Sequence, residues 1–336
     1  MALFIGTQAH AELNGAARFT ALAGFDTNAL RDYDTSSNGL DLAANLLGDF
    51  SGQWRGEAAV VQGDYSVGAR KFIRFPSEDL LVQAATLEAA YGVSENASVG
   101  VIGTAKDRRD RGESRDYSDF AALGYVDFYP DPRLDLRLRG GAHRFIYQPH
   151  FSYSFGAPEG GASLSWRFDK RHSMFVFGEY GDRTYSGFQR FTDGTISETS
   201  RRHDSAISAG AGYEFKGGFR FRIDYAYFEL SSNSFGETNI RHRVSAMFAT
   251  RLFWRVNLIA QGALQLTRYP DGVFLSPEIV LVQDEENSNS ISVKLVRPIT
   301  DRLDAELRYA LYQYRLPLND LAYLRQVGWV GLSFRL

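Results

Sequence analysis

The sequence predicts an all-β fold, a transmembrane antiparallel up-and-down β-barrel of about 16 strands, or about 18 as the alternative. Three observations support this prediction. Apolar and polar residues alternate with period two over most of the 336 residues, which is the spacing of strands. Tight turns and longer polar connections take turns down the chain, as they do in outer-membrane barrels. No run of roughly 18 apolar residues occurs, so no transmembrane helix is available.

The predicted strands alternate most clearly in seven segments. In 133–141, three leucines share one parity, and Asp135, Arg137 and Arg139 share the other. Such segments are long enough for a barrel, because about ten residues tilted near 45° cross a hydrocarbon layer. In chain order the segments are GLDLAANLLGDF (39–50), WRGEAAVV (54–61), RLDLRLRGG (133–141), GASLSWRF (161–168), AISAGAGYEF (206–215), FRFRIDYAY (219–227) and LDAELRYAL (303–311).

The connections are expected to be short on the periplasmic side and long on the extracellular side. Tight turns are predicted at 48–52, 93–96, 129–133, 169–172, 216–218, 252–254 and 298–302. Longer loops are predicted at 30–38, 65–78, 106–116, 188–202, 231–238 and 269–287. Residues 15–336 are therefore expected to form a single transmembrane barrel domain, preceded by an N-terminal periplasmic segment, 1–14.

Two other all-β folds share the alternation. A soluble β-sandwich would bury its apolar face and would have no reason to place charges inside. A β-propeller would show a repeat of about 40–50 residues, and the sequence has none. The polar parity is small or charged on nearly every strand, and aromatic residues gather beside the predicted turns as in an interfacial girdle. The apolar parity is therefore expected to face lipid, and the polar parity to face a water-filled interior.

The residue types exclude several functions. Cysteine is absent, which excludes a disulfide framework, a thiolate metal site and a Cys nucleophile. The net charge of −3 does not indicate nucleic-acid binding. No Walker loop, Gly-x-Ser-x-Gly elbow or His-Glu-x-x-His motif occurs, so no catalytic residue, cofactor or metal site is predicted and the chain is not expected to be an enzyme. His203 and Asp204 are adjacent and would point to opposite faces of a strand, and they and the acidic stretch 282–290 are expected in solvated loops.

Arginine outnumbers lysine 32 to 5. GC-rich coding explains such a bias without function, whereas guanidinium groups also hold carboxylates and phosphates with paired hydrogen bonds. Interior arginines would attract anionic or polyhydroxy solutes, unless they only pair with carboxylates across strands. Phe175, Phe177 and Tyr312 are inward candidates to stack against sugars or simply to pack. The candidate lumen and substrate-path residues are Asp135, Arg137, Arg139, Arg167, Glu179, Arg220, Arg222, Asp224, Arg243, Glu306 and Arg308.

Two stretches resemble known outer-membrane barrels. Residues 15–32, GAARFTALAGFDTNALRD, contain Gly24, Phe25, Asp26, Thr27 and Asn28, a pattern similar to the end of the first strand in barrel domains of bacterial exopolysaccharide exporters of the cellulose and poly-N-acetylglucosamine type. The last residues, VGWVGLSFRL, resemble the C-terminal signal read by the barrel-assembly machinery, although Leu336 stands where Phe or Trp is usual. Those exporters carry a helical-repeat portion that this chain lacks, so the resemblance implies a separate periplasmic export partner protein.

The leading expectation is an outer-membrane channel that passes a secreted exopolysaccharide through an Arg-rich polar lumen. One alternative is a general or anion-selective uptake porin. The other is a non-transporting barrel that anchors an envelope complex for motility or adhesion. In each case the chain is expected to be integral to a bacterial outer membrane and in contact with its lipids. The start MALFIGTQAH lacks a basic region followed by a long apolar core, so the signal peptide is expected to be missing from this sequence.

Overall fold

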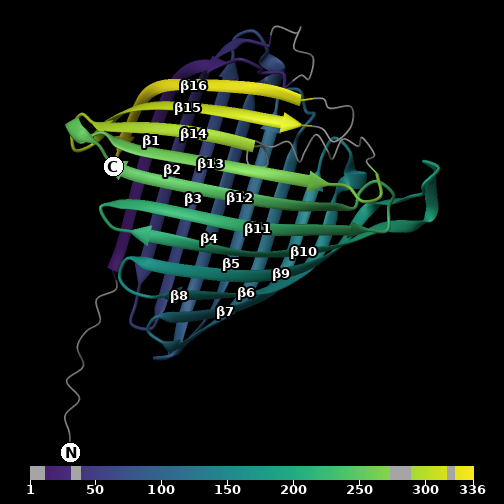
Figure 1. The fold of residues 1–336 in the computed structure, drawn as a ribbon, viewed down its shortest axis with the longest axis horizontal. Helices are drawn as coiled ribbons and strands as arrows, with labels where there is room; N and C mark the ends of the chain where they lie inside the picture. Colours follow the sequence, from purple (N-terminus) through teal and green to yellow (C-terminus); the bar gives the residue numbers. More distant parts are fainter. Residues whose placement is uncertain (1–11, 32–38, 273–288, 316–321) are drawn as a thin grey trace, which may run out of the picture.

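The computed structural model describes residues 12–31, 39–272, 289–315 and 322–336. These residues form 16 antiparallel strands in one closed barrel, in which each strand pairs with its neighbours in sequence and β1 pairs with β16. Figure 1 views the barrel from the side, with the green and yellow later strands in front of the purple and blue first strands. The predicted fold class and strand number are confirmed. Within the described ranges, no helix is long and apolar enough to cross a membrane.

The strands are 10 to 21 residues long, and the described parts of the connections contain three single-turn 3₁₀ helices. The first eight strands are β1 (Glu12–Asp26), β2 (Asp41–Arg55), β3 (Ala59–Phe72), β4 (Leu80–Ser94), β5 (Ala97–Asp110), β6 (Tyr117–Asp131), β7 (Leu134–Tyr147) and β8 (Phe155–Arg167). The others are β9 (His172–Arg190), β10 (Ile196–Lys216), β11 (Phe219–Ser232), β12 (Asn239–Arg251), β13 (Asn257–Arg268), β14 (Asn289–Pro298), β15 (Leu303–Arg315) and β16 (Ala322–Arg335). The 3₁₀ helices are η1 (Pro76–Glu78), η2 (Phe151–Tyr153) and η3 (Phe253–Arg255).

The connections at one end of the barrel, the turn end, have two to five residues, and those at the other, the loop end, have five or more. Six of the seven predicted tight turns are found at the turn end. In the turn between β8 and β9, Asp169 accepts hydrogen bonds from the backbone N–H groups of Arg171 at 2.7 Å and His172 at 2.9 Å. These bonds hold the pKa of Asp169 below its ordinary value, because they favour the ionised carboxylate.

The predicted turn at 48–52 is wrong, because these residues lie inside β2 and the turn follows at 56–58. This segment contains two glycines and a serine, which are common in turns. The inward–outward alternation of the strand nevertheless continues through Asp49 and Ser51, which pair with Arg18 and Ala16 of β1. Residues 54–61 accordingly span the end of β2, this turn and the start of β3 rather than forming one strand.

Three predicted loops are shorter than expected, because strand pairing continues into them. β3 extends to Phe72, so the loop spans 73–79 instead of the predicted 65–78, and β5 extends to Asp110, so the next loop spans 111–116. β9 and β10 pair as far as Arg190 and Ile196, and this long hairpin projects beyond the loop end (Figure 1). His203 therefore lies within β10 rather than in a solvated loop. Of the predicted loop 269–287 and the acidic stretch 282–290, residues 273–288 lie outside the described residues.

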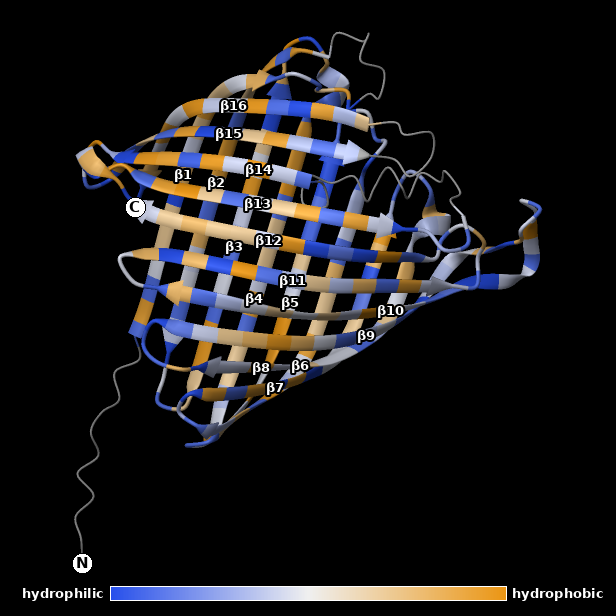
Figure 2. Ribbon diagram, viewed as in Figure 1, coloured by the Kyte–Doolittle hydropathy of each residue, from blue (hydrophilic) through white to orange (hydrophobic). Residues whose placement is uncertain are grey.

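The polar parity lies on the concave, inner face of the barrel. The guanidinium of Arg137 (β7) lies 3.6 Å from the carboxylate of Glu88 on β4, three strands away, and the Tyr125 hydroxyl (β6) donates to the same carboxylate. Side chains of strands this far apart can meet only across the hollow of a closed sheet. The outer face carries large apolar side chains such as Leu138, which is 54% exposed. Figure 2 shows the resulting alternation of hydrophobic and hydrophilic residues along the strands.

The inner face is not polar throughout. Near the loop end, a buried apolar cluster joins the first three strands to the last; it comprises Leu22, Ala29, Ala43, Phe72, Val327 and Trp329, with Leu47, Phe75 and Tyr312 packed against it. This cluster differs from the expectation of small or charged inner residues on nearly every strand. Apolar side chains that face inward and pack on one another exclude water from their contacts, even in a hollow barrel. The inner wall around the junction of β1 and β16 is therefore partly shielded from water.

Candidate functional site: the barrel lumen

The eleven residues predicted to line the lumen all share the inner register. Arg139 pairs with Gly161, Gly161 with Glu179, Glu179 with Ser208, Ser208 with Phe228 and Phe228 with Arg241, so one row crosses from β7 to β12. Residues two positions along each strand share this face. The others in the inner register are Asp135, Arg137, Arg167, Arg220, Arg222, Asp224, Arg243, Glu306 and Arg308.

The arginines that stood out in the sequence are paired with carboxylates. Arg137 donates to Asp127 at 2.6 and 2.9 Å and stacks over the Tyr125 ring at 4.0 Å. Arg220 donates to Glu214 at 2.5 Å, and Arg222 donates to both oxygens of Asp224 at 2.9 Å. Ion pairs with carboxylates therefore account for these arginines individually, across neighbouring strands for Arg137 and Arg220 and along β11 for Arg222.

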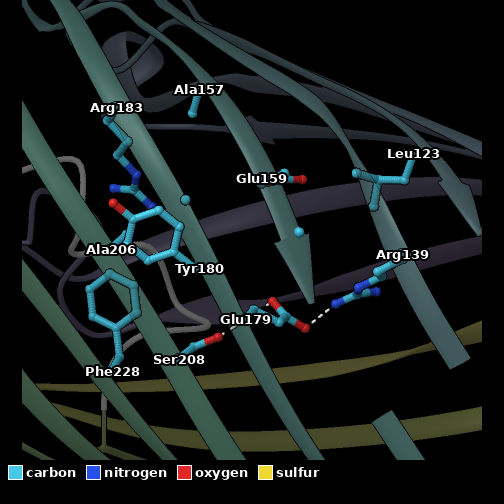
Figure 3. A pocket seen from close by; sticks show the side chains of 12 residues that line it. Leu123, Arg139, Ala157, Glu159, Glu179, Tyr180, Arg183, Ala206, Ser208 and Phe228 are labelled. Carbon is cyan, nitrogen blue, oxygen red and sulfur yellow. Dashed lines mark hydrogen bonds and ion pairs between the residues drawn. The ribbon is translucent and has the colours of Figure 1, made fainter. Parts of the chain in front are cut away.

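Arg139 and Glu179 form an ion pair across the intervening strand β8. Figure 3 shows the Glu179 carboxylate between Arg139 and Ser208, whose hydroxyl donates to it at 3.4 Å. The two charged side chains are 38% and 37% exposed, although they lie near the middle of their strands. The space in front of this pair is therefore open to water.

Two of the predicted residues, Arg167 and Asp135, differ from this pattern of ion pairs. Arg167 donates to the backbone carbonyl of Pro132 at 2.7 Å in the turn between β6 and β7, so it fastens a turn. Asp135 has one buried carboxylate oxygen without a hydrogen-bond partner.

The most crowded carboxylate is Glu306 on β15. It accepts from Arg18 (β1) at 2.7 Å, from Arg308 at 2.6 and 2.9 Å, from Lys294 (β14) at 3.0 Å and from Ser333 (β16) at 2.5 Å. Its side chain is 0% exposed. This set, the Glu306 cluster, ties the last three strands to the first near the turn end.

A second ion pair closes the same junction near the loop end. Arg325 (β16) donates through Nε to both oxygens of Asp26 (β1) at 2.9 Å, and both side chains are buried. Asp26 also accepts the backbone N–H of Asn28 at 3.1 Å. The Gly-Phe-Asp-Thr-Asn stretch thus has a structural use here, because its aspartate joins the two ends of the sheet.

Two phenylalanines of β9 form a flat platform on the inner wall. The rings of Phe175 and Phe177 lie 6.4 Å apart at an interplanar angle of 20°. They cover Gly212 and Gly210 of β10, where an added Cβ would come within 2.3 and 2.5 Å of the rings. Arg222 lies 5.0 Å above Phe175. Tyr312, the third predicted aromatic, also faces inward and lies under Arg325 at 5.8 Å.

Sequence reasoning missed a group of cations at the loop-end half of the lumen. Arg241 (β12) lies 3.9 Å from the centroid of the Phe228 ring (β11), and Arg183 (β9) lies 5.8 Å from it. Arg183 also lies 4.7 Å from the Phe155 ring. Parity was the available signal, since Arg183 shares its face with Phe175, Phe177 and Glu179, but a strand position alone does not distinguish a paired guanidinium from an unpaired one.

A small hollow in the inner wall adjoins this group (Figure 3). Its volume is about 90 Å³. Charged, hydroxyl and apolar side chains all line it. Its lining is Leu123, Arg139, Ala157, Glu159, Gly160, Glu179, Tyr180, Gly181, Arg183, Ala206, Ser208 and Phe228.

The adjacent His203 and Asp204 point to opposite faces of β10, as their spacing predicts. His203 faces outward and lies 2.8 Å from Asp182, whereas Asp204 faces inward and binds Arg202. His143 lies in the lumen between Asp119 at 2.5 Å and Glu159 at 3.5 Å. Among the residues that the structure describes, no group of three or more His, Asp or Glu side chains is arranged to hold a metal ion.

No protein-family model and no curated protein sequence matches the chain. Among solved structures, the Salmonella typhi OmpF complex with daunomycin aligns over 96% of this chain and 97% of its own, with a TM-score of 0.55 and 12% identity. The anion-selective porin from Comamonas acidovorans aligns over 97% and 100%, with a TM-score of 0.51 and 9% identity. At such identities the likeness concerns the fold alone. The chain therefore has the porin fold, a closed β-barrel of 16 antiparallel strands.

Proposed function

We propose that this protein is an outer-membrane channel through which small polar solutes diffuse, with a preference for anions. The observation that carries the proposal is the solvent-open pair of Arg139 and Glu179 near the middle of the inner wall, 38% and 37% exposed. Charged side chains there are hydrated, as the wall of an aqueous pore requires, and barrels of about 16 strands are wide enough to leave such a pore.

The preference for anions follows from the distribution of inner charge. Most inner carboxylates bind a guanidinium, an imidazole or backbone N–H groups, so they contribute little free negative potential. Arg183 and Arg241 have aromatic rings as their close partners instead. A charged wall next to low-dielectric protein concentrates counter-ions, and passage also requires that each contact be weak enough to break.

The test is ion conduction by the purified barrel in a planar bilayer. Discrete conductance steps are expected. In a KCl gradient, the sign of the reversal potential should show that chloride is more permeant than potassium. A barrel that inserts without any current would contradict the proposal and favour the non-transporting anchor of an envelope complex.

Export of a secreted exopolysaccharide is the second candidate, supported by the platform of Phe175 and Phe177. Flat aromatic faces on an inner wall suit the apolar faces of sugar rings. This role needs a periplasmic export partner protein, and either role needs the barrel-assembly machinery for insertion. Soluble oligosaccharides should then interrupt the ion current, and Phe175→Leu with Phe177→Leu should shorten the interruptions. If both forms pass ions undisturbed by sugars, only the diffusion channel stands.

A further inference from the structure

We propose that the inner wall holds a binding site for a small organic anion, formed by Arg183 and Arg241 around the Phe228 ring. The site deepens the proposed channel function and rests on it, because a solute reaches these residues through the lumen. The ligand class is a carboxylate or phosphate group joined to a compact apolar part.

The first support is the gathering of positive charge. Arg241 lies 3.9 Å and Arg183 5.8 Å from the Phe228 ring centroid. Arg183 and Arg243 both lie close enough to Arg241 for their charges to repel it. Guanidinium groups held together in a partly buried place cost free energy unless an anion compensates them.

The second support is that no protein carboxylate within the described ranges compensates these two arginines. The Nε of Arg241 is buried and has no hydrogen-bond partner. Asp204 is opposite Arg183 in the β9–β10 register, but its oxygens accept from Arg202 at 2.6 to 3.1 Å and from Ser232 at 2.5 Å. The Asp204 carboxylate is thus already occupied.

The third support is the adjoining hollow, because Arg183 and Phe228 line it as well. Ala157, Gly181 and Ala206 give it a small, apolar side. Its two carboxylates are engaged: Glu179 with Arg139, and Glu159 with His143 at 3.5 Å. These carboxylates would repel a second anionic group, so the ligand should carry its charge at one end and an apolar part at the other.

The ligand is held by the guanidinium forks through charge-assisted hydrogen bonds, while the apolar part lies against Phe228 and the small residues of the hollow. About 90 Å³ limits this part to a compact group. Such a site would hold an anion briefly on its way through the pore, since binding that favours entry must still permit exit.

Calorimetric titration of the folded barrel in detergent tests the site directly. Benzoate and phenyl phosphate are the probes, and they distinguish a carboxylate from a phosphate group; inorganic phosphate and benzyl alcohol supply the charge and the ring separately. We expect the two organic anions to bind more tightly than either separate part. Arg183→Gln with Arg241→Gln should weaken their binding about a hundredfold, because each lost charge-assisted hydrogen bond contributes roughly a factor of ten or more.

Arg251→Gln is the matched control, because Arg251 lies on the same strand and parity as Arg241, at the turn end. It removes the same charge and should leave benzoate binding unchanged. Arg183→Lys with Arg241→Lys keeps the positive charge but removes the paired N–H donors of the guanidinium group, so an intermediate affinity is expected. This Lys variant takes the place of the Gln variant if the latter does not fold. Equal benzoate binding by the wild type and the charge-removed variant would overturn the site, as would equally tight binding of benzyl alcohol.

Conduction separates the site from the channel function. Ion current without benzoate binding would leave the channel standing and refute the site. Benzoate binding that depends on Arg183 and Arg241, in a barrel that carries no current, would retain the site and refute the channel.

Discussion

At the scale of single residues, the interior depends on which side chains reach one another. Parity alone places Arg137 on the inner face, but its partners Asp127 and Glu88 lie on β6 and β4. The Glu306 carboxylate draws its donors from four strands, including Arg18 at the opposite end of the chain. Such convergence makes individual inner residues unequal in their effect on stability.

Glu306→Gln should be strongly destabilising. The change removes the charge of a fully buried carboxylate that Arg18, Lys294 and Arg308 share, and leaves these half-buried cations beside a neutral group, which costs about 3–5 kcal/mol. Urea unfolding in lipid vesicles measures the free energy of unfolding. Glu214→Gln is the control, because Glu214 binds Lys216 and Arg220, whose side chains are 58% and 51% exposed, and exposed pairs contribute less than about 1 kcal/mol. Equal losses in the two variants would contradict this account.

Gly212→Ala should also destabilise the barrel, by roughly 1–3 kcal/mol. The added Cβ would come within 2.3 Å of the Phe175 ring and 2.4 Å of the Asp224 carboxylate. Gly178→Ala is the matched control on the neighbouring strand, since no atom lies within 4 Å of the Cβ that it would add. Midpoints of urea unfolding compare the two. If Gly212→Ala unfolds at the same urea concentration as Gly178→Ala, the platform is not packed as described.

The pairing of inner charges could not be predicted from the sequence. Alternation assigned a face to Arg139 and Glu179 because each strand has its own period of two. Their contact depends on strand order, on register and on side-chain length across β8, and none of these is local. Arg183 and Arg241 show the converse: each occupies the same kind of position as the paired arginines, and only the neighbours show that their partners are rings.

At the scale of elements, strand existence was predictable and strand ends were not. The predicted turn at 169–172 forms, and Asp169 stabilises it by accepting hydrogen bonds from backbone N–H groups within the turn. Residues 48–52 instead continue as a strand, because β1 and β3 pair with them on both sides. The ends of β9 and β10 are likewise set by pairing between the two strands. Glycine and serine mark a turn only where no neighbouring strand pairs with them.

Leu138→Arg tests the assignment of the outer face. Leu138 lies near the middle of β7 on the parity opposite to Arg137 and Arg139, so a charge there would enter the hydrocarbon layer. We expect a loss of roughly 2–4 kcal/mol in vesicles. Ser163→Arg, which adds the same side chain inward and opposite Arg137, should lose much less. Comparable losses for both would mean that the outer face is not in contact with lipid.

At the scale of the whole molecule, the inner charges form pairs whose two members affect ion flow in opposite ways. Arg139 and Glu179 are the exposed example, since they face the open lumen and compensate each other. The selectivity of such a wall depends on small imbalances in charge rather than on its total. Single substitutions in one pair should therefore move selectivity in either direction.

Glu179→Gln should raise the ratio of anion to cation permeability, and Arg139→Gln should lower it, each by roughly twofold. The first change leaves a free cation at mid-wall and the second a free anion. Reversal potentials in a KCl gradient measure both, with the wild type as reference. A double substitution should return the ratio close to the wild-type value. Shifts in the same direction for both single variants would rule out control by this pair.

The Glu306 cluster has a consequence for how the barrel is assembled. The carboxylate lies on a late strand, yet one of its donors, Arg18, comes from the first. An open sheet would hold Glu306 beside Lys294 and Arg308 with one donor missing. If β1 docked on β16 two residues out of register, Ala16 or Thr20 would replace Arg18 at that height. The cluster thus stabilises correct closure over a shifted register, because only the closed barrel in its correct register brings Arg18 to Glu306.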